Sequence, residues 1–231
     1  MSSLRKQLQR GVLFAGWKTA AVCVALAVAD YVASLGYDVL NHGPYRMFLR
    51  TPIDQALPVV PIAVIPYDSL QPFIYASLVI FLVFRVRVFQ SAVLSMIATF
   101  LVSYVFFALL QTYVDRPTLT GDDTFTRMIR DVYAGDHPFN DFPSLHVSTS
   151  TIIAIHWWRF LRAYSLPLVV WAGLIAISTV LVKQHYVPDI GGGLVLAFGT
   201  SILFWHLLER WHGATPNVEA PSRRTAGLSR R

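Results

Sequence analysis

The chain has 231 residues, of which 55% are hydrophobic and 14% are charged. Because a soluble domain carries about 25% charged residues, this composition excludes an ordinary soluble globular protein. The net charge of +6 does not require a nucleic-acid partner, since arginines beside anionic lipid account for it.

Apolar blocks of about 15 to 22 residues follow one another along the chain, close to the length that crosses a bilayer core. The blocks are continuous and do not alternate, so they predict helices and not barrel strands. The expected spans are 17–34, 70–84, 92–111, 144–161, 166–182 and 187–208. The predicted fold class is therefore all-α integral membrane, with six transmembrane helices in one domain over residues 1–212.

The two ends of the chain are basic. Arg5, Lys6 and Arg10 precede the first block, which is too long for the apolar core of a signal peptide, so we expect an uncleaved first helix. This block also holds the single cysteine, Cys23, which excludes an intrachain disulfide and multi-cysteine metal sites. Residues 213–231 have no apolar period, which predicts a disordered basic cytoplasmic tail.

Lysine and arginine are unevenly divided between the two sides of a six-span protein. The connections 36–69 and 112–142 hold most of the aspartates, whereas the termini and the other connections hold most of the basic residues. The positive-inside rule then places both termini in the cytoplasm and these two connections outside. We expect a plasma-membrane protein, in a bacterium an inner-membrane protein, whose active site faces the external or periplasmic side.

One candidate catalytic segment is His185-Tyr186-Val187-Pro188-Asp189, at the external end of the last predicted span. On a helix, a spacing of four residues places His185 and Asp189 on one face. A carboxylate that accepts a hydrogen bond from one imidazole nitrogen makes the other a better nucleophile or base. Pro188 fits the first turn of a helix. The alternative is an ordinary helix start in which Asp189 only favours the helix dipole.

A second candidate segment is Pro143-Ser144-Leu145-His146. Ser144 stands where an N-cap is expected, and the free amides of a helix start together with its hydroxyl form an anion site. From the first turn, His146 can protonate a leaving oxygen and then deprotonate the incoming water or alcohol. The alternative is a capping serine beside an interfacial histidine.

A phosphate dianion requires cationic partners, and two residues are candidates. Arg116, followed by Pro117, suits bidentate phosphate contact. Lys183 projects from the same face as Thr179 if the fifth helix continues through it. The alternatives are a solvated loop arginine and a lysine that snorkels at the interface.

A metal site built from His146, His185 and Asp189 is a further possibility for this cluster. Arg116 and Lys183 argue against it, because cations beside an empty metal site repel the metal. We therefore predict no metal and no cofactor.

The order and spacing of these residues resemble the type-2 phosphatidic acid phosphatase superfamily, specifically its branch that looks like inositol phosphorylceramide synthases. The superfamily has three motifs, Lys-(six)-Arg-Pro, Pro-Ser-Gly-His and Ser-Arg-(five)-His-(three)-Asp. The matching residues are Arg116-Pro117, then Pro143-Ser144-Leu145-His146, then Ser178, His185 and Asp189. The resemblance implies six helices and a metal-independent mechanism. It also implies a phosphohistidine on His185, with His146 as acid and base and Asp189 as orienter.

Three positions depart from these motifs. Leu109 stands in place of the lysine, Thr179 in place of the arginine and Leu145 in place of the glycine. Two cations are therefore missing, and Lys183 is the candidate to supply one. Elsewhere, Asp30 is costly inside a span and is either functional or close to the outer interface. The run Gly191-Gly192-Gly193 is expected to permit close helix packing.

These patterns together predict a membrane-embedded phosphoryl-transfer enzyme, namely a lipid phosphate or pyrophosphate phosphatase that acts at the external leaflet through a phosphohistidine. Its expected partners are a lipid phosphate substrate and the bilayer. One alternative is a lipid head-group phosphotransferase that resembles inositol phosphorylceramide synthase. A transporter and a non-catalytic membrane scaffold are further alternatives.

Overall fold

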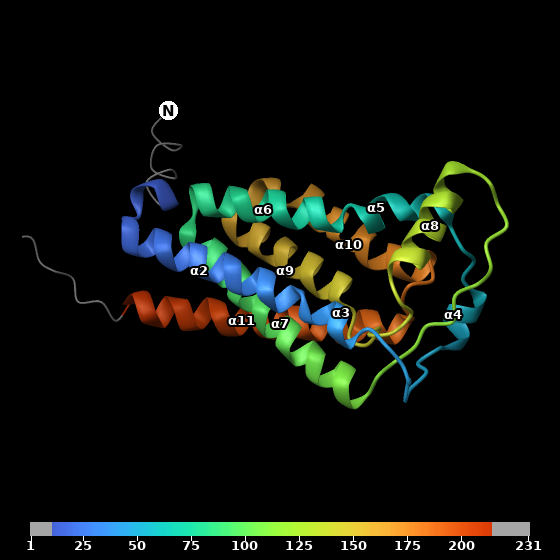
Figure 1. Cartoon of the computed structure of the whole chain (residues 1–231). Helices are drawn as coiled ribbons and strands as arrows, with labels where there is room; N and C mark the ends of the chain where they lie inside the picture. Colours follow the sequence, from blue (N-terminus) through green and yellow to red (C-terminus); the bar gives the residue numbers. More distant parts are fainter. Residues whose placement is uncertain (1–10, 214–231) are drawn as a thin grey trace, which may run out of the picture.

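A computed structural model describes residues 11–213, and all regular elements in this range are helices. Figure 1 shows long helices that run side by side, with short helices gathered at one end of the bundle. The long helices are α2 (Trp17–Ser34), α6 (Leu70–Phe84), α7 (Val86–Leu109), α9 (Leu145–Phe160), α10 (Leu166–Leu181) and α11 (Val187–Gly213). The short elements are η1 (Val12–Phe14), α3 (Gly36–Leu40), α4 (Pro52–Ala56), η2 (Pro61–Ala63), α5 (Val64–Asp68), α8 (Thr124–Gly135) and η3 (Arg162–Tyr164).

The long helices fall on the six apolar blocks, and the third begins earlier than expected, at Val86. Four helical segments are long and apolar enough to cross a membrane, namely Trp17–Leu40, Pro61–Phe84, Val86–Leu109 and Val187–Arg210. The chain is therefore an all-helical integral membrane protein. α9 and α10 are shorter, with 16 residues each, so a count of six spans stays a prediction.

α9 is the inner helix of the bundle, because it packs against α6, α7, α10 and α11. This position explains how an internal helix tolerates polar residues. The His156 ring contacts the Ile152 carbonyl oxygen at 2.7 Å through Nδ1 and the Ser91 hydroxyl at 2.9 Å through Nε2. The Ser148 hydroxyl donates to the Ser144 carbonyl oxygen at 2.7 Å. A buried polar group costs little when it is hydrogen-bonded inside the protein, as these are.

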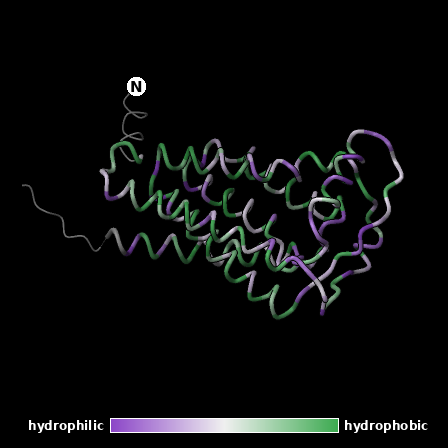
Figure 2. The backbone as a smooth tube through the Cα atoms, in the orientation of Figure 1, coloured by the Kyte–Doolittle hydropathy of each residue, from purple (hydrophilic) through white to green (hydrophobic). Residues whose placement is uncertain are grey.

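Both ends of the described chain lie at one end of the bundle, while α4 and α8 lie at the opposite end (Figure 1). Figure 2 shows hydrophobic residues along the long helices and hydrophilic residues gathered in the loops around α4 and α8. The placement of both termini in the cytoplasm stays a prediction. Residues 1–10 and 214–231, which include the predicted tail, lie outside the described range.

The connection 112–142, predicted as a loop, contains the amphipathic helix α8. Asp123 is its N-cap, with Oδ1 accepting from the amides of Phe125 and Thr126 at 3.1 Å each. Its apolar face joins a small core with η2, α5 and the end of α10, centred on the fully buried Ile129. The helix therefore closes the bundle over the end where both histidine segments lie.

Candidate active site

The loop between α10 and α11 presents His185. α10 ends at Leu181, and Lys183 adopts a left-handed conformation with φ of 57°. The Thr179 carbonyl oxygen then accepts from two amides beyond the turn, Gln184 at 2.9 Å and His185 at 3.1 Å. These bonds fix the backbone at the histidine. The condition for Lys183 to project from the same helix face as Thr179 is not met, because α10 ends two residues before Lys183 and the chain reverses there.

Asp189, in the first turn of α11, lies behind the His185 ring. His185 Nδ1 is 3.5 Å from Asp189 Oδ2, and the Asp189 side chain is fully buried. The same Oδ2 accepts from the Tyr186 amide at 2.7 Å, which holds the carboxylate in place. Nδ1 is therefore the ring nitrogen that faces the carboxylate, and Nε2 is the nitrogen free for chemistry.

His146 lies beside His185, although it comes from a different helix. The centroids of the two imidazole rings are 5.8 Å apart, with the ring planes at 64°. On its other side, His146 stacks on Tyr67 of α5, with centroids 4.4 Å apart and planes at 20°. Tyr67 therefore fixes the plane of the His146 ring, and the two histidine segments meet at one place.

Ser144 caps α9, as the sequence predicts, and its hydroxyl accepts from the Val147 amide at 3.4 Å. Its own amide donates to the Asp189 carbonyl oxygen at 3.2 Å, which ties the start of α9 directly to the start of α11. A Cβ at Gly193 would lie only 2.8 Å from the Ser144 carbonyl oxygen and 2.8 Å from Val147 Cβ. Close packing is thus confirmed at Gly193, where only glycine permits this approach.

Arg116 is largely buried and heavily bonded. Nη1 donates to the carbonyl oxygens of Tyr133 at 3.3 Å and Asp136 at 2.7 Å, while Nη2 donates to the His137 carbonyl oxygen at 3.3 Å and to Gln184 Oε1. The Asp136 carboxylate lies 3.8 Å from Nη2. The guanidinium therefore joins α8 and the following loop to the residue before His185.

Lys183 points its ammonium toward the α4 segment. Nζ donates to the carbonyl oxygens of Asp54 at 3.0 Å and Leu57 at 2.7 Å. The buried Asp54 carboxylate in turn accepts from the Val187 amide at 2.9 Å through Oδ1. Residues 54–57 are therefore hydrogen-bonded to the chain on both sides of His185, at Lys183 and at Val187. Burial lowers the pKa of the Lys183 ammonium.

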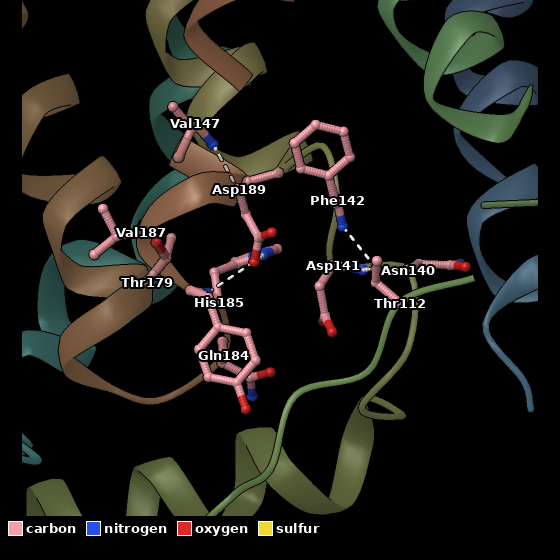
Figure 3. A network of polar contacts seen from close by, with 12 residues as sticks. Thr112, Asn140, Asp141, Phe142, Val147, Thr179, Gln184, His185, Val187 and Asp189 are labelled. Atoms are coloured by element: carbon pink, nitrogen blue, oxygen red, sulfur yellow. Dashed lines mark hydrogen bonds and ion pairs between the residues drawn. The ribbon is translucent and has the colours of Figure 1, made fainter. Parts of the chain in front are cut away.

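Asp141 is a site residue that no sequence motif indicated. It is 3% exposed, it precedes the Phe142-Pro143 bond, and its amide donates to the Thr112 hydroxyl at 3.0 Å (Figure 3). Burial raises the pKa of its carboxyl well above the usual range, the Asp189 carboxylate raises it further, and Arg116 opposes the shift. Its signal in the sequence is only its position two residues before Pro143.

Several buried polar atoms around the two histidines have no hydrogen-bond partner among residues 11–213. They are Arg116 Nε, Asp141 Oδ2, Gln184 Nε2, His185 Nδ1 and Asp189 Oδ1. Buried polar atoms are normally paired, so such a concentration is typical of a site that binds a polar ligand. The set contains both hydrogen-bond donors and acceptors.

Leu109 and Thr179 stand where the motifs have lysine and arginine, so these two positions supply no positive charge to the site. Leu109 is exposed at the end of α7, and its carbonyl oxygen accepts from Arg46 Nη1 at 3.2 Å. The Thr179 hydroxyl is buried and donates to the Ala176 carbonyl oxygen at 2.8 Å. Within residues 11–213, no group of three or more His, Cys, Asp or Glu side chains is arranged to hold a metal ion.

A comparison with protein families matches residues 91–212 to the PAP2 superfamily. The match covers more than half of the chain and includes every motif residue discussed above, so the protein belongs to the PAP2 superfamily. A search of curated proteins and a search of solved structures each gave no match. Membership implies a membrane phosphatase-type phosphoryl-transfer enzyme that takes phosphate substrates, in a family whose members are generally metal-independent.

Proposed function

We propose that this protein transfers the phosphoryl group of a lipid phosphate or pyrophosphate to water, at the external leaflet, through a phosphohistidine on His185. The observation that carries the proposal is the pairing of His146 and His185, with ring centroids 5.8 Å apart and Asp189 3.5 Å behind one of them. A nucleophile backed by an orienting carboxylate and faced by a second acid-base group is the arrangement that covalent phosphoryl transfer needs. The domain over residues 1–212 would hold the whole site.

In the first step, His185 Nε2 attacks phosphorus and the bond between phosphorus and the lipid oxygen breaks. His146 donates a proton to the departing oxygen. Asp189 stabilises the positive charge on the phosphorylated imidazole. In the second step, His146 takes a proton from water, the oxygen attacks phosphorus, and His185 is released with free phosphate.

Ser144, Arg116 and Lys183 are the proposed phosphate ligands. Ser144 Oγ accepts from an amide, which leaves its own proton for a phosphoryl oxygen. Arg116 Nε is buried, has no partner among the described residues and is the guanidinium donor left for phosphate. The Lys183 ammonium has three donors and uses two on backbone carbonyls, so one remains.

The acceptor distinguishes the phosphatase from its alternative, a lipid head-group phosphotransferase that resembles inositol phosphorylceramide synthase. Leu145 in place of the motif glycine and the Lys183–Tyr186 run favour this alternative. Incubating the purified protein with lipid phosphates, with and without diacylglycerol or ceramide, separates the two. Free phosphate indicates hydrolysis, and a new phospholipid indicates transfer.

Trapping of the phosphoenzyme tests the proposal directly. The full chain is pulsed with a lipid phosphate carrying ³²P and quenched, and the protein-bound label is characterised. We expect label on wild type that is acid-labile and alkali-stable, as a phosphohistidine is, and no label on His185→Ala. His206→Ala is the matched control, because His206 is 63% exposed on α11 and bonds only Glu209 among the described residues. Label that persists in His185→Ala would overturn the assignment.

A further inference from the structure

A cavity of about 620 Å³ runs between α2, α6, α7 and α9. At one end it is lined by His146 and Tyr67, two residues of the candidate active site. Most of the remaining wall is apolar, with Leu78, Val93 and Met96 among its residues. The cavity therefore joins the proposed phosphate site to a hydrophobic space inside the bundle.

The cavity opens sideways between α2 and α6. α2 packs mainly on α7, and the lining residues Tyr31, Leu35, Tyr75 and Val79 are between 48% and 61% exposed. Both helices belong to segments of membrane-spanning length, so these exposed apolar side chains face the hydrocarbon region. A lipid chain can enter from the bilayer without crossing water.

Asp30 places a carboxyl group in this apolar wall. Its Oδ1 atom is buried and has no hydrogen-bond partner in the part of the chain that the structure describes. Asp30 precedes Tyr37 by seven residues along α2 and α3, which corresponds to about 10 Å of depth. Tyr37 marks the level of the site, because its hydroxyl bonds the Asp136 carboxylate at 3.1 Å. A carboxyl group without a hydrogen bond at such depth costs free energy. A ligand that donates a hydrogen bond to it removes this cost and therefore binds more tightly.

We propose that this cavity binds the chain of the substrate lipid and that Asp30 accepts a hydrogen bond from a hydroxyl or amide N–H next to the lipid head group. The inference rests on the proposed function, since the phosphate of that lipid would lie at His146 and His185. The interfacial layer of a bilayer is about 5 to 8 Å thick on each side, so Asp30, about 10 Å below the site, lies just beneath this layer, next to the linkage between head group and chains. A linkage with only ester oxygens offers Asp30 no donor.

Two matched pairs of lipids test the specificity with the full chain in mixed micelles. The first pair is 1-oleoyl lysophosphatidate and its 2-deoxy analogue, which differ by one hydroxyl. The second is ceramide 1-phosphate and dioleoyl phosphatidate, which differ in amide and hydroxyl donors at equal chain number. Each pair competes in one micelle, so the product ratio gives the ratio of kcat/KM. The pair that responds identifies a glycerol hydroxyl or a sphingoid linkage as the group that Asp30 binds.

We expect Asp30→Leu to lower the preference for the donor-bearing lipid by roughly 10- to 100-fold, and Asp30→Asn to retain part of it through its amide oxygen. Asp131→Asn is the control and should keep the wild-type ratio, since Asp131 is an exposed carboxylate on α8 that does not line the cavity. Equal ratios in wild type and Asp30→Leu for both pairs, or a preference for the donor-free lipids in wild type, would overturn the inference.

A binding measurement separates this inference from the proposed function. Non-hydrolysable phosphonate analogues of the same pairs are bound to the delipidated protein and quantified by mass spectrometry. Selective retention that depends on Asp30, without turnover of any lipid phosphate, would refute the enzymatic proposal and support the lipid site. Turnover of lipid phosphates with the same selectivity in wild type and Asp30→Leu would support the enzymatic proposal and refute the role of Asp30 in the lipid site.

Discussion

At the scale of single residues, the two histidines have unequal roles under the proposed mechanism. His185 forms the covalent bond to phosphorus, whereas His146 only moves protons. Tyr67 stacks on His146 and Asp189 stands behind His185, so each ring is held by a different neighbour. The chemistry of the leaving group can therefore tell them apart.

We expect His185→Ala to abolish turnover of every substrate and His146→Ala to slow an alkyl phosphate by on the order of 100-fold or more. An aryl phosphate with a good leaving group should lose much less in His146→Ala, because its oxygen leaves without protonation. The measurement is the formation rate of the phosphoenzyme for both substrates. Equal losses for good and poor leaving groups would remove His146 from the acid role.

Asp141 gives a prediction on pH. Burial and the Asp189 and Asp136 carboxylates raise the pKa of its carboxyl in the folded protein, and Arg116 only partly offsets this. The folded state then binds more protons than the unfolded state, so Asp141 destabilises the protein increasingly as the pH rises above its unfolded pKa of about 3.9. Asp141→Asn should therefore raise the Tm at pH 8, with a gain that shrinks as the pH falls toward 4. A gain in Tm that is constant between pH 5 and pH 8 would contradict a raised pKa of the Asp141 carboxyl in the folded protein.

Residue types with strong local rules were predictable from the sequence. Ser144 as N-cap follows from a capping residue before an apolar run, and the His185–Asp189 spacing follows from helix periodicity. The direction of the Lys183 side chain was not predictable, because it depends on a left-handed turn and on two carbonyls more than 120 residues earlier. Gln184 and Asp141 reach the site through tertiary packing alone.

At the scale of elements, the close contact of α9 and α11 sets the geometry of the site. The Ser144 amide donates to the Asp189 carbonyl oxygen at 3.2 Å, so the two helix starts are locked together. Glycines on α11 make this possible, and they differ in their surroundings. A Cβ at Gly193 would meet backbone and side-chain atoms at 2.8 Å, whereas a Cβ at Gly191 would meet nothing within 4 Å.

We expect Gly193→Ala to destabilise the protein by about 1 to 3 kcal/mol, because the helices must separate. Gly191→Ala is the control and should be neutral or stabilising by up to about 1 kcal/mol, since alanine favours the helix. Thermal unfolding and the phosphoenzyme rate are measured for both variants. Similar shifts of Tm for the two would show that this contact does not constrain the helices.

α8 shows where an element was predictable and was missed. Asp123 is a typical N-cap, and apolar residues at 125, 128, 129, 132 and 133 have helical period. The helix is amphipathic and contains Arg127 and Arg130, so a search for continuous apolar blocks passes over it. The bounds of α2, α6, α9 and α10, in contrast, were predictable to within one residue because hydrophobic length is a strong signal, whereas α7 begins six residues earlier and α11 ends five residues later than expected.

At the scale of the whole molecule, charge is separated between the two ends of the bundle. Arg85 lies between α6 and α7, Arg159 in the last turn of α9 and Arg162 in η3, at the end that holds both described termini, and the candidate site lies at the other end (Figure 1). The positive-inside rule predicts that the basic end is cytoplasmic. The site would then take its lipid from the external leaflet, so the orientation decides which pool of lipid phosphate the protein meets.

Cysteine accessibility tests this orientation. Cys23 is first replaced by serine, and single cysteines are then introduced at Asp122 and at Tyr164. Asp122 has a side chain that is 93% exposed, and its ion pair with Arg130 contributes little, so the substitution should not disturb the fold. Tyr164 is 75% exposed in η3, at the opposite end of the bundle, and serves as the control.

We expect a membrane-impermeant maleimide to label Asp122→Cys in intact cells, and to label Tyr164→Cys only after permeabilisation, because the bilayer separates the two ends. The reverse pattern would place the site in the cytoplasm and make cytoplasmic lipid phosphates its substrates.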